Sequence, residues 1–372
     1  MEYKEYELGE LLYYEQPTPY IVESTDYNDA YETPVLTAGK SFILGYTDEK
    51  EGIYDQLPVI IFDDFTTASQ YVNFKFKVKS SAMKILTPVT ELVLPKYIYY
   101  RIQIIQFDHS THKRYWIQQY SKIRVSIPPI PEQECIVARI EELFSQLDAG
   151  VETLKKTKAQ LAVYRQAVLK EAFEGDYPRK QLKEFSKAIS GFAFKSSRYS
   201  PDGNYVVVKI GNVKERHFDF SRDLTKTLEA DDSILEKYLL RRGDCLITLT
   251  GSRGKRDYGF VAMVGNQNNY LLNQRVAALR FDQSVALPEF FQYYLASPSY
   301  RGMFFGYETG NVGQGNVGIK ALLDPYVILP DIDTQKRIVE DVEDRLSVCD
   351  SIEQTVDTAL QQAEAMRQSI LK

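Results

Sequence analysis

The sequence contains one long segment twice. "IPPIPEQECIVARIEELFSQLD" (residues 127–148) aligns without a gap with "LPDIDTQKRIVEDVEDRLSVCD" (residues 329–350), 202 positions later. The alignment continues to "YRQAVLK" (164–170) and "MRQSILK" (366–372). Matched identities include four pairs: Gln133 with Gln335, Glu141 with Glu343, Asp148 with Asp350, and Arg165 with Arg367. An ungapped match of this length predicts a duplicated structural unit, and two copies are too few for a solenoid.

Each copy has the pattern of one long helix. Prolines stand before the helix start, and apolar side chains then recur every seven residues, which predicts a left-handed coiled coil. We expect the two helices to pair antiparallel and to give the chain an approximate two-fold axis. Two unrelated surface helices would explain the apolar stripes but not the matched identities. The predicted seam comprises Ile136, Ile140, Leu143, Leu147, Leu154, Leu161 and Val168 in the first copy, and Ile338, Val342, Ile352, Val356 and Ile370 in the second.

The duplicated helices divide the chain into four parts. We predict a first domain at 1–127, a central spacer helix at 128–176, a second domain at 177–327 and a distal spacer helix at 328–372. Both domains have the mixed pattern of an α/β fold. Expected elements are strands at 57–62, 72–80, 204–213, 244–251 and 275–281, and a short helix at 287–300.

Charge is unevenly distributed along the chain. The net charge is −6, but residues 177–327 carry 21 Lys and Arg against 15 Asp and Glu, a net +6. Residues 1–127 carry 13 against 17, a net −4. A basic segment in an acidic chain favours nucleic-acid contact. Three scattered cysteines without a CxxC motif argue against a disulfide framework and fit a reducing cytoplasm. No apolar run reaches the length of a membrane span.

Glycine-rich loops of the second domain carry cationic and amide side chains. Arg and Lys suit guanine edges and phosphates, and Asn and Gln suit adenine edges. Glycine lets the backbone approach a phosphate closely. Each loop alone is as well explained as a solvated turn, but together with the +6 charge the loops favour DNA contact. The predicted contact residues are Lys195, Ser196, Arg198, Lys209, Asn212, Ser252, Arg253, Lys255, Arg256, Asn273, Arg275, Gln314 and Asn316.

The first domain has a weaker version of this pattern. Three lysines alternate along a predicted strand, a pattern that also fits a solvated strand edge. His109 and His112 stand three residues apart, but no carboxylate or thiol cluster completes a metal site, so no metal is expected. The predicted DNA-contacting residues here are Thr66, Thr67, Lys75, Lys77, Lys79, Ser80, Lys113 and Arg114.

Catalytic motifs are not found in this sequence. "GSRGK" (251–255) is too short for a phosphate-binding loop, and Arg256 follows it where Ser or Thr is required. "GNVGQGNVG" (310–318) does not stand between a strand and a long helix, as a dinucleotide fingerprint does. With three histidines and no acid–base constellation, we expect a non-catalytic chain that holds no cofactor.

Several of these segments resemble the specificity (S) subunits of type I restriction–modification enzymes. "PPIPEQECIVARIEELFSQLDAGVETLKKTKAQLAVYRQAVLKEAFEG" (128–175) resembles their central spacer, and 329–372 resembles its distal partner. "GFAFKSSRY", "GDCLITLTGSRG" and "LLNQRVAALR" resemble pieces of a target-recognition domain. The resemblance implies that each recognition domain reads one half of a split double-stranded DNA sequence and that the helical spacer sets the gap.

The resemblance also implies partners. Two methyltransferase subunits would dock on the spacer, and restriction subunits would join the complex. S-adenosylmethionine and ATP with Mg²⁺ would then bind to those partner subunits. Two alternatives stay open at this stage. One is a coiled-coil scaffold that binds partners without reading DNA. The other is an enzyme fused to recognition domains, which would need a methyltransferase or nuclease motif that we do not find.

Overall fold

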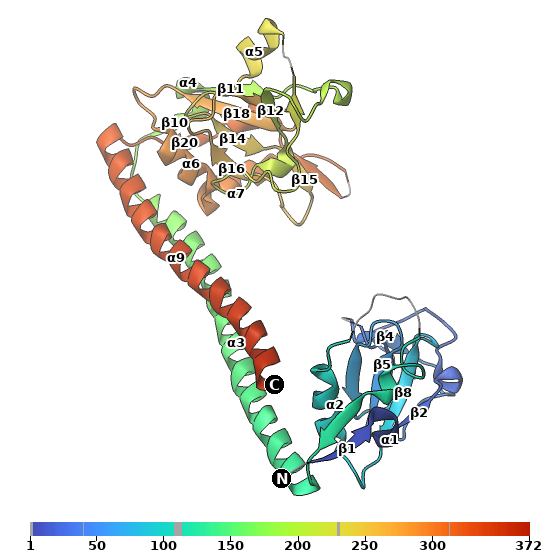
Figure 1. Cartoon of the computed structure of the whole chain (residues 1–372). Helices are drawn as coiled ribbons and strands as arrows, with labels where there is room; N and C mark the ends of the chain where they lie inside the picture. The colour runs from blue at the N-terminus through green and yellow to red at the C-terminus, as the bar shows by residue number, and fades with distance from the viewer. Residues whose placement is uncertain (1–2, 40, 108–113, 229–230, 312) are drawn as a thin grey trace. The chain divides into compact units, whose positions relative to one another are not determined.

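The computed structural model describes residues 3–39, 41–107, 114–228, 231–311 and 313–372. The chain divides into two compact units, one formed by residues 1–155 with 358–372 and the other by 156–357. Two long helices, α3 (Ile130–Ala172) and α9 (Ile332–Ile370), contribute to both units (Figure 1). These are the helices that the duplicated sequence predicts. None of the helices that the structure describes has the length and apolar character of a membrane span.

The α/β part of the first unit, called domain one below, contains three small sheets. The first and last strands pair antiparallel, a four-stranded sheet has the order β2-β8-β5-β6, and a three-stranded sheet has the order β4-β3-β7. The elements are β1 (Lys4–Glu7), α1 (Leu8–Leu11), β2 (Leu12–Glu15), η1 (Thr18–Tyr20), β3 (Thr33–Leu36), β4 (Ile43–Thr47), β5 (Val59–Asp63), β6 (Ser69–Val72), β7 (Lys77–Val78), β8 (Met83–Pro88), α2 (Pro95–Gln103), η2 (Tyr120–Lys122) and β9 (Arg124–Ile127).

The α/β part of the second unit, called domain two, repeats this plan. Its four-stranded sheet has the order β11-β18-β14-β16 and its three-stranded sheet the order β13-β12-β17, while β10 pairs with β20 and β15 with β19. The elements are β10 (Arg179–Gln181), α4 (Leu182–Phe185), β11 (Ser186–Ser190), η3 (Ser196–Arg198), β12 (Tyr205–Val208), η4 (Ile210–Asn212), β13 (Lys226–Thr227), α5 (Asp232–Tyr238), β14 (Cys245–Thr248), β15 (Thr250–Ser252), β16 (Val261–Met263), β17 (Tyr270–Leu272), β18 (Val276–Phe281), α6 (Pro288–Ala296), α7 (Pro298–Gly306), β19 (Gln314–Asn316), α8 (Ile319–Leu323) and β20 (Tyr326–Ile328).

Apart from the additional pair β15–β19 in domain two, the two domains share their topology strand by strand. In each three-stranded sheet the middle strand, β3 or β12, pairs antiparallel with one neighbour and parallel with the other. The buried strands β5 and β14 lie inside their four-stranded sheets and are almost wholly apolar, as strands covered on both faces must be. The duplication visible in the helices therefore extends through the domains, where the sequence alignment does not show it.

The strand predicted at 72–80 is wrong. β6 ends at Val72, and β7 consists of Lys77 and Val78 alone, in a different sheet. The residues between them bring Phe76 back into the core, where its backbone pairs with that of Tyr54. The alternation of lysines and apolar residues is real, but the segment bends from one sheet to the other instead of forming one edge.

The seven-residue period of the long helices is confirmed, and the predicted seam is covered except at one position. Positions 140, 147, 154, 161 and 168 are buried or half-buried, as are 342, 349, 356, 363 and 370. Of the other predicted seam residues, Ile136, Leu143 and Ile338 are half-buried, and Ile352 is 40 % exposed. The second covered row lies one residue later, at Phe144, Val151, Lys158 and Arg165 on α3 and at Val339, Leu346, Glu353, Leu360 and Arg367 on α9.

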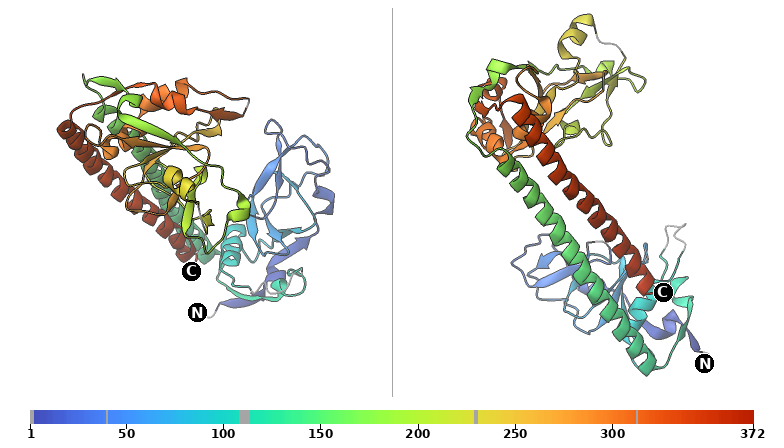
Figure 2. Two further views of the ribbon diagram at one scale, coloured as in Figure 1. Left: turned by 90° about the horizontal axis from the view of Figure 1, so that it is seen from above. Right: turned by 90° about the vertical axis from the view of Figure 1, so that its left-hand side faces the viewer.

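Ion pairs show that the two helices run antiparallel. Within the second unit Lys158 pairs with Asp357 at 2.7 Å and Arg165 with Asp350 at 2.6 Å. Residue numbers rise along α3 as they fall along α9, and the views of Figure 2 show the two ribbons side by side. The covered second row is thus partly charged, which explains why an apolar heptad search does not include it.

Candidate nucleic-acid interface

A glycine pair forms the centre of an arm in domain two. The arm, residues 249–260, connects β14 to β16, and its strand β15 pairs with β19 so that Gly251 lies opposite Gly315. A Cβ atom on either glycine would collide with Tyr258, which is fully buried. The Tyr258 hydroxyl donates a 2.5 Å hydrogen bond to Glu308, and burial together with this carboxylate raises the pKa of the phenol. The small residues therefore let a tyrosine fix the base of the arm.

Arginines attach the arm to the body of the domain. Arg301 donates to the carbonyl oxygens of Gly259 at 2.7 Å and Tyr258 at 3.1 Å, and burial lowers the pKa of its guanidinium. Arg253 donates to the Gly310 carbonyl at 3.1 Å and pairs with Glu308 at 3.6 Å. The Arg253 charge is thereby partly compensated inside the domain.

The tip of the arm presents two exposed cations. Lys255 makes no hydrogen bond or ion pair with any residue that the structure describes, and it follows Gly254, whose φ is +87°. Arg256 has φ +50°, and its guanidinium lies 4.9 Å from the centre of the Phe305 ring. The arm can therefore place positive charge on an approaching anion.

The loop Asn273–Arg275, between β17 and β18, is fixed on both sides. The backbone N–H of Asn273 donates to Val208, that of Gln274 donates to Phe192 at 2.9 Å, and the Arg275 carbonyl accepts from Leu249 at 2.9 Å. Arg275 holds φ at +68°, a conformation that costs a non-glycine residue free energy and that these bonds enforce. Its exposed side chain has no hydrogen-bond or ion-pair partner within the described part of the chain.

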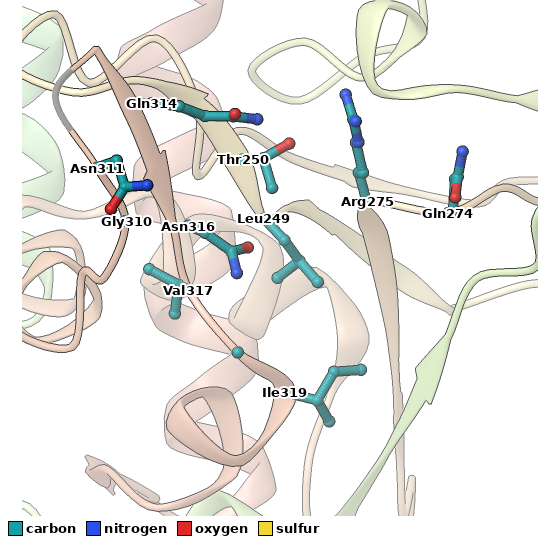
Figure 3. Close-up of a pocket in the computed structure, with 11 residues that line it drawn as sticks. Leu249, Thr250, Gln274, Arg275, Gly310, Asn311, Gln314, Asn316, Val317 and Ile319 are labelled. Carbon is teal, nitrogen blue, oxygen red and sulfur yellow. The ribbon is translucent and has the colours of Figure 1, made fainter.

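Two open hollows flank Arg275. The first, of about 590 Å³, is lined by Leu249, Thr250, Gln274, Arg275, Gly310, Asn311, Gln314, Asn316, Val317, Gly318 and Ile319. The second, of about 490 Å³, shares Thr250, Arg275 and Gln314 with the first and is also lined by Gly251, Ser252 and Asp257. Figure 3 shows Gln314, Thr250, Arg275 and Gln274 following one another across the first hollow, with Asn316 below them.

Some predicted contact residues are engaged inside domain two. Asn212 is 1 % exposed, accepts from the Lys209 backbone and donates to the carbonyl oxygens of Asp219 and Asp223. The Lys209 ammonium binds the Asp223 carboxylate at 3.0 Å and the Thr225 hydroxyl at 2.5 Å. These two residues hold a loop together rather than offering free donors. The residue types in the sequence, charged or amide, do not distinguish such an internal role from contact with a ligand.

The remaining predicted residues of domain two lie nearer the surface. Ser252 donates through its backbone and its hydroxyl to Asp257 and so belongs to the arm. Lys195 and Ser196 are exposed at the start of η3, and Arg198 is 3.8 Å from Asp231. Asn273 is half-buried beside the fixed loop. The structure thus brings together Arg275, Gln314 and Asn316 around one hollow and places Lys195 to Arg198 elsewhere.

Domain one places its predicted residues less consistently. Thr66 and Thr67 lie in the β5–β6 turn, where Thr66 is exposed, and Ser80 is half-buried. Lys75 is exposed and pairs weakly with Asp55 at 3.5 Å, and Lys79 and Arg114 are exposed. Lys113, His109 and His112 lie outside the described residues.

Lys77 is buried, contrary to the expectation of a surface cation. It is 4 % exposed, and its ammonium binds the Glu49 carboxylate at 2.7 Å and the Glu51 carbonyl at 2.7 Å. The structure gives this lysine a role inside the domain. The reason is the bend between β6 and β7, which turns the expected outer face of the strand inward.

Sequence reasoning did not select Thr250 or Asn311 as contact residues, and it noted Gln274 in the "LNQR" segment without placing it among the predicted contacts. All three line the first hollow. Gln274 stands in the same "LNQR" segment as Arg275, and Asn311 in the same glycine-rich segment as Gln314. Thr250 follows the buried run of β14 and carries no charge or amide that would mark it. The pairing of β15 with β19, together with the hydrogen bond from the Leu249 N–H to the Arg275 carbonyl, brings these segments to one place.

Comparisons with known proteins agree on one family. Residues 174–362, just over half of the chain, match the type I restriction modification DNA specificity domain. The EcoR124I/EcoR124II type I restriction enzyme specificity subunit of Escherichia coli is 45 % identical over 196 residues, which are 50 % of this chain and 48 % of that protein. The EcoKI specificity subunit of Escherichia coli K12 is 28 % identical over 271 residues, 68 % of this chain and 57 % of that protein. The matches thus span about half the length of these relatives.

Solved structures share the fold. A chain from a study of complex assembly and conformational transition of the type I R-M system aligns over 100 % of this chain and 96 % of its own length, with a TM-score of 0.71 and 17 % identity. The HsdS subunit from Thermoanaerobacter tengcongensis aligns over 100 % of this chain and 95 % of its own, with a TM-score of 0.54 and 16 % identity.

Proposed function

Because the chain belongs to the family of the type I restriction modification DNA specificity domain, we propose that it is a DNA-recognition and scaffolding subunit of a type I restriction–modification complex. Each α/β domain reads one half of a split site in double-stranded DNA, and the helix pair α3–α9 sets the gap and docks methyltransferase subunits. S-adenosylmethionine, ATP and Mg²⁺ bind to the partner subunits, which include restriction subunits. The chain itself performs no catalysis and works in the cytoplasm.

One observation in domain two carries the proposal. Lys255, Arg256 and Arg275 are exposed in a net-positive segment of an otherwise acidic chain, and neutral amides surround Arg275. Cations supply sequence-independent affinity for phosphates, and amides beside an arginine supply donors and acceptors for base edges. A scaffold that binds only proteins has no need of this combination.

Mapping of adenine methylation by single-molecule sequencing tests the proposal. The comparison is between cells that carry the gene together with its methyltransferase genes and cells from which this gene alone is deleted. We expect one split motif with a fixed gap to lose its methylation upon deletion. Unchanged methylation in an otherwise active system would contradict sequence recognition by this chain.

The role of the helix pair is tested by lengthening both helices together. Seven residues inserted between Thr157 and Lys158 in α3, and seven between Asp357 and Thr358 in α9, preserve the heptad and keep every described ion pair on its own side of the insertion. At about 1.5 Å per residue the insertion adds roughly 10 Å, the length of about three base pairs. We expect a methylated motif with a longer gap and unchanged half-site letters. Altered letters would exclude a spacer role.

A further inference from the structure

The first hollow of domain two differs in composition from a phosphate site. Of the residues that line it, Arg275 is the one cation, and no carboxylate is among them. Five neutral polar side chains accompany it: Thr250, Gln274, Asn311, Gln314 and Asn316. Phosphate sites collect several cations or backbone N–H groups. A single guanidinium among amides and a hydroxyl instead matches the alternating donors and acceptors of base edges in the major groove.

The floor of the hollow supports the same reading. The half-buried Ile319 and a small exposed part of Leu249 supply apolar surface beside the polar side chains. Apolar contact suits the methyl group of thymine and the faces of base edges, whereas a phosphate gains nothing from it. The hollow is therefore built to discriminate between neutral surfaces rather than to neutralise charge.

The backbone at Arg275 has the rigidity that discrimination requires. Its loop is held by hydrogen bonds to Val208, Phe192 and Leu249, and the residue keeps φ at +68°. Gly191 packs so closely on the Asn273 carbonyl that a Cβ there would overlap it. Lys255 provides the contrast, because the residue before it, Gly254, is not packed against other parts of the domain. A Cβ atom added to Gly254 would meet no atom within 4 Å. A phosphate contact tolerates a mobile side chain, but two parallel hydrogen bonds to one base do not.

We propose that Arg275 is a specificity-determining residue that reads a guanine through two parallel hydrogen bonds, with the hollow beside it receiving the neighbouring base edges. The proposal rests on the proposed function of domain two. Guanine offers two acceptors, O6 and N7, in the spacing of the guanidinium fork, and no other base presents two acceptors there. Lys255, at the tip of the arm, contacts phosphate instead.

The decisive variant is Arg275→Lys, because it keeps the charge and removes the fork. The full chain, in complex with its methyltransferase subunits, selects from a library of random-sequence DNA duplexes, and the bound duplexes are sequenced. The wild type should enrich two half-sites. Arg275→Lys should lose the preference for guanine at one position of one half-site by roughly 10- to 100-fold, and the other half-site serves as an internal control. Arg275→Ala should relax the same position.

Matched measurements separate the outcomes. Lys255→Ala should leave every letter unchanged while the slope of log affinity against log salt falls by about 0.9, the value for one lost phosphate contact. The melting temperature of Arg275→Lys should equal that of the wild type, because the described residues give its side chain no partner. An unchanged motif with Arg275→Lys overturns the proposal. A wild type that enriches no motif overturns the proposed function itself.

Discussion

The two domains join their long helices in the same way and differ in the loops that face away from those joints. Gln133, at the start of α3, accepts from the Leu94 backbone at 2.8 Å and donates to the carbonyl oxygens of Leu92 and Pro128. Gln335, at the start of α9, repeats the three bonds with Leu287, Val285 and Pro330 at 2.8 Å each. Both glutamines are fully buried. We call each set a glutamine clamp.

Other duplicated residues support the clamps. Glu141 on α3 pairs with Lys96 of α2, and its counterpart Glu343 on α9 accepts from Tyr293 of α6 at 3.4 Å. Leu94 and Leu287, which donate to the clamps, are the N-cap residues of these same short helices. Each clamp thus satisfies a backbone N–H that the helix itself leaves unpaired. The same arrangement in both domains fixes the orientation of each domain on the start of the long helix that follows it.

The loops away from the joints show no such identity. Domain one connects β5 to β6 by the short turn 64–68, where domain two has the arm 249–260 between the equivalent strands. Domain one carries net −4 and domain two net +6. The comparison shows that the joints between domain and helix are duplicated, whereas the loops away from the joints differ in length and in charge.

Removal of a clamp should have the largest effect. Gln133→Ala or Gln335→Ala leaves one backbone N–H and two carbonyl oxygens buried without their partner, and we expect a loss of about 3 kcal/mol or more in unfolding free energy. Urea unfolding measures it. Trp116 is the only tryptophan and lies buried in domain one, so its fluorescence reports that domain, while circular dichroism reports the whole chain.

The duplicated and exposed Gln166 and Gln368 provide matched controls for the clamps. Their alanine variants should change the unfolding free energy by less than about 0.5 kcal/mol. The Trp116 transition should shift in Gln133→Ala. Equal midpoints for a clamp variant and its control would show that the clamp does not hold the joint. A large loss at one clamp and none at the other would break the equivalence of the two joints.

The buried lysine of domain one should have the next largest effect. Lys77→Met removes the cation that faces Glu49, and we expect a loss of about 2 kcal/mol, since an unpaired carboxylate stays partly buried. Lys75→Met is the control, because its ion pair is exposed on both sides and should contribute under about 0.5 kcal/mol. A comparable loss in both variants would contradict the internal role of Lys77.

The same pair predicts a pH dependence. Partial burial would raise the pKa of Glu49, but the Lys77 ammonium and the backbone N–H groups of Ser24 and Glu23 outweigh it, so the pKa lies below its usual value. The ionised form therefore stabilises the fold above the unfolded pKa of about 4.3, and this contribution is lost as pH falls through the folded pKa. Urea unfolding followed by Trp116 fluorescence measures this dependence. The difference in unfolding free energy between pH 7 and pH 3.5 should be smaller for Lys77→Met than for the wild type.

The long helices were predictable because a repeat and an apolar period reinforce each other in one contiguous segment. The buried row from Ile140 to Val168 is recoverable for that reason. Lys158 and Arg165 belong to the covered second row, but a search for apolar residues does not detect them because they are charged. Their aliphatic stems cover the seam while their charged groups bind carboxylates.

The proposed interface could be predicted from the sequence only in outline. Arg275, Gln314 and Asn316 were selected by residue type, and the structure does bring them to one hollow. Residue type also selected Lys77 and Asn212, which are buried with their polar atoms engaged. The difference depends on contacts between segments far apart in the chain, such as β15 with β19, and no local pattern carries that information.

The smallest expected effect concerns the duplicated arginines of the helix pair. Arg165 binds Asp350 at 2.6 Å and Glu353 at 2.7 Å, with its side chain 19 % exposed. Arg367 pairs with Asp148 and lies over the Phe144 ring, with its side chain 38 % exposed. Alanine at 165 should therefore cost about 1–2 kcal/mol, and alanine at 367 about 0.5 kcal/mol.

Double-mutant cycles in urea unfolding isolate the two pairs, Arg165 with Asp350 and Arg367 with Asp148. The first should show the larger coupling and the weaker dependence on salt, because Arg165 is more buried than Arg367. Equal couplings would mean that the duplicated residues, and not their surroundings, set the strength of each pair. Unequal couplings would show that the helices resemble the two domains in this respect. Identical duplicated residues would then contribute different free energies because they are buried to different extents.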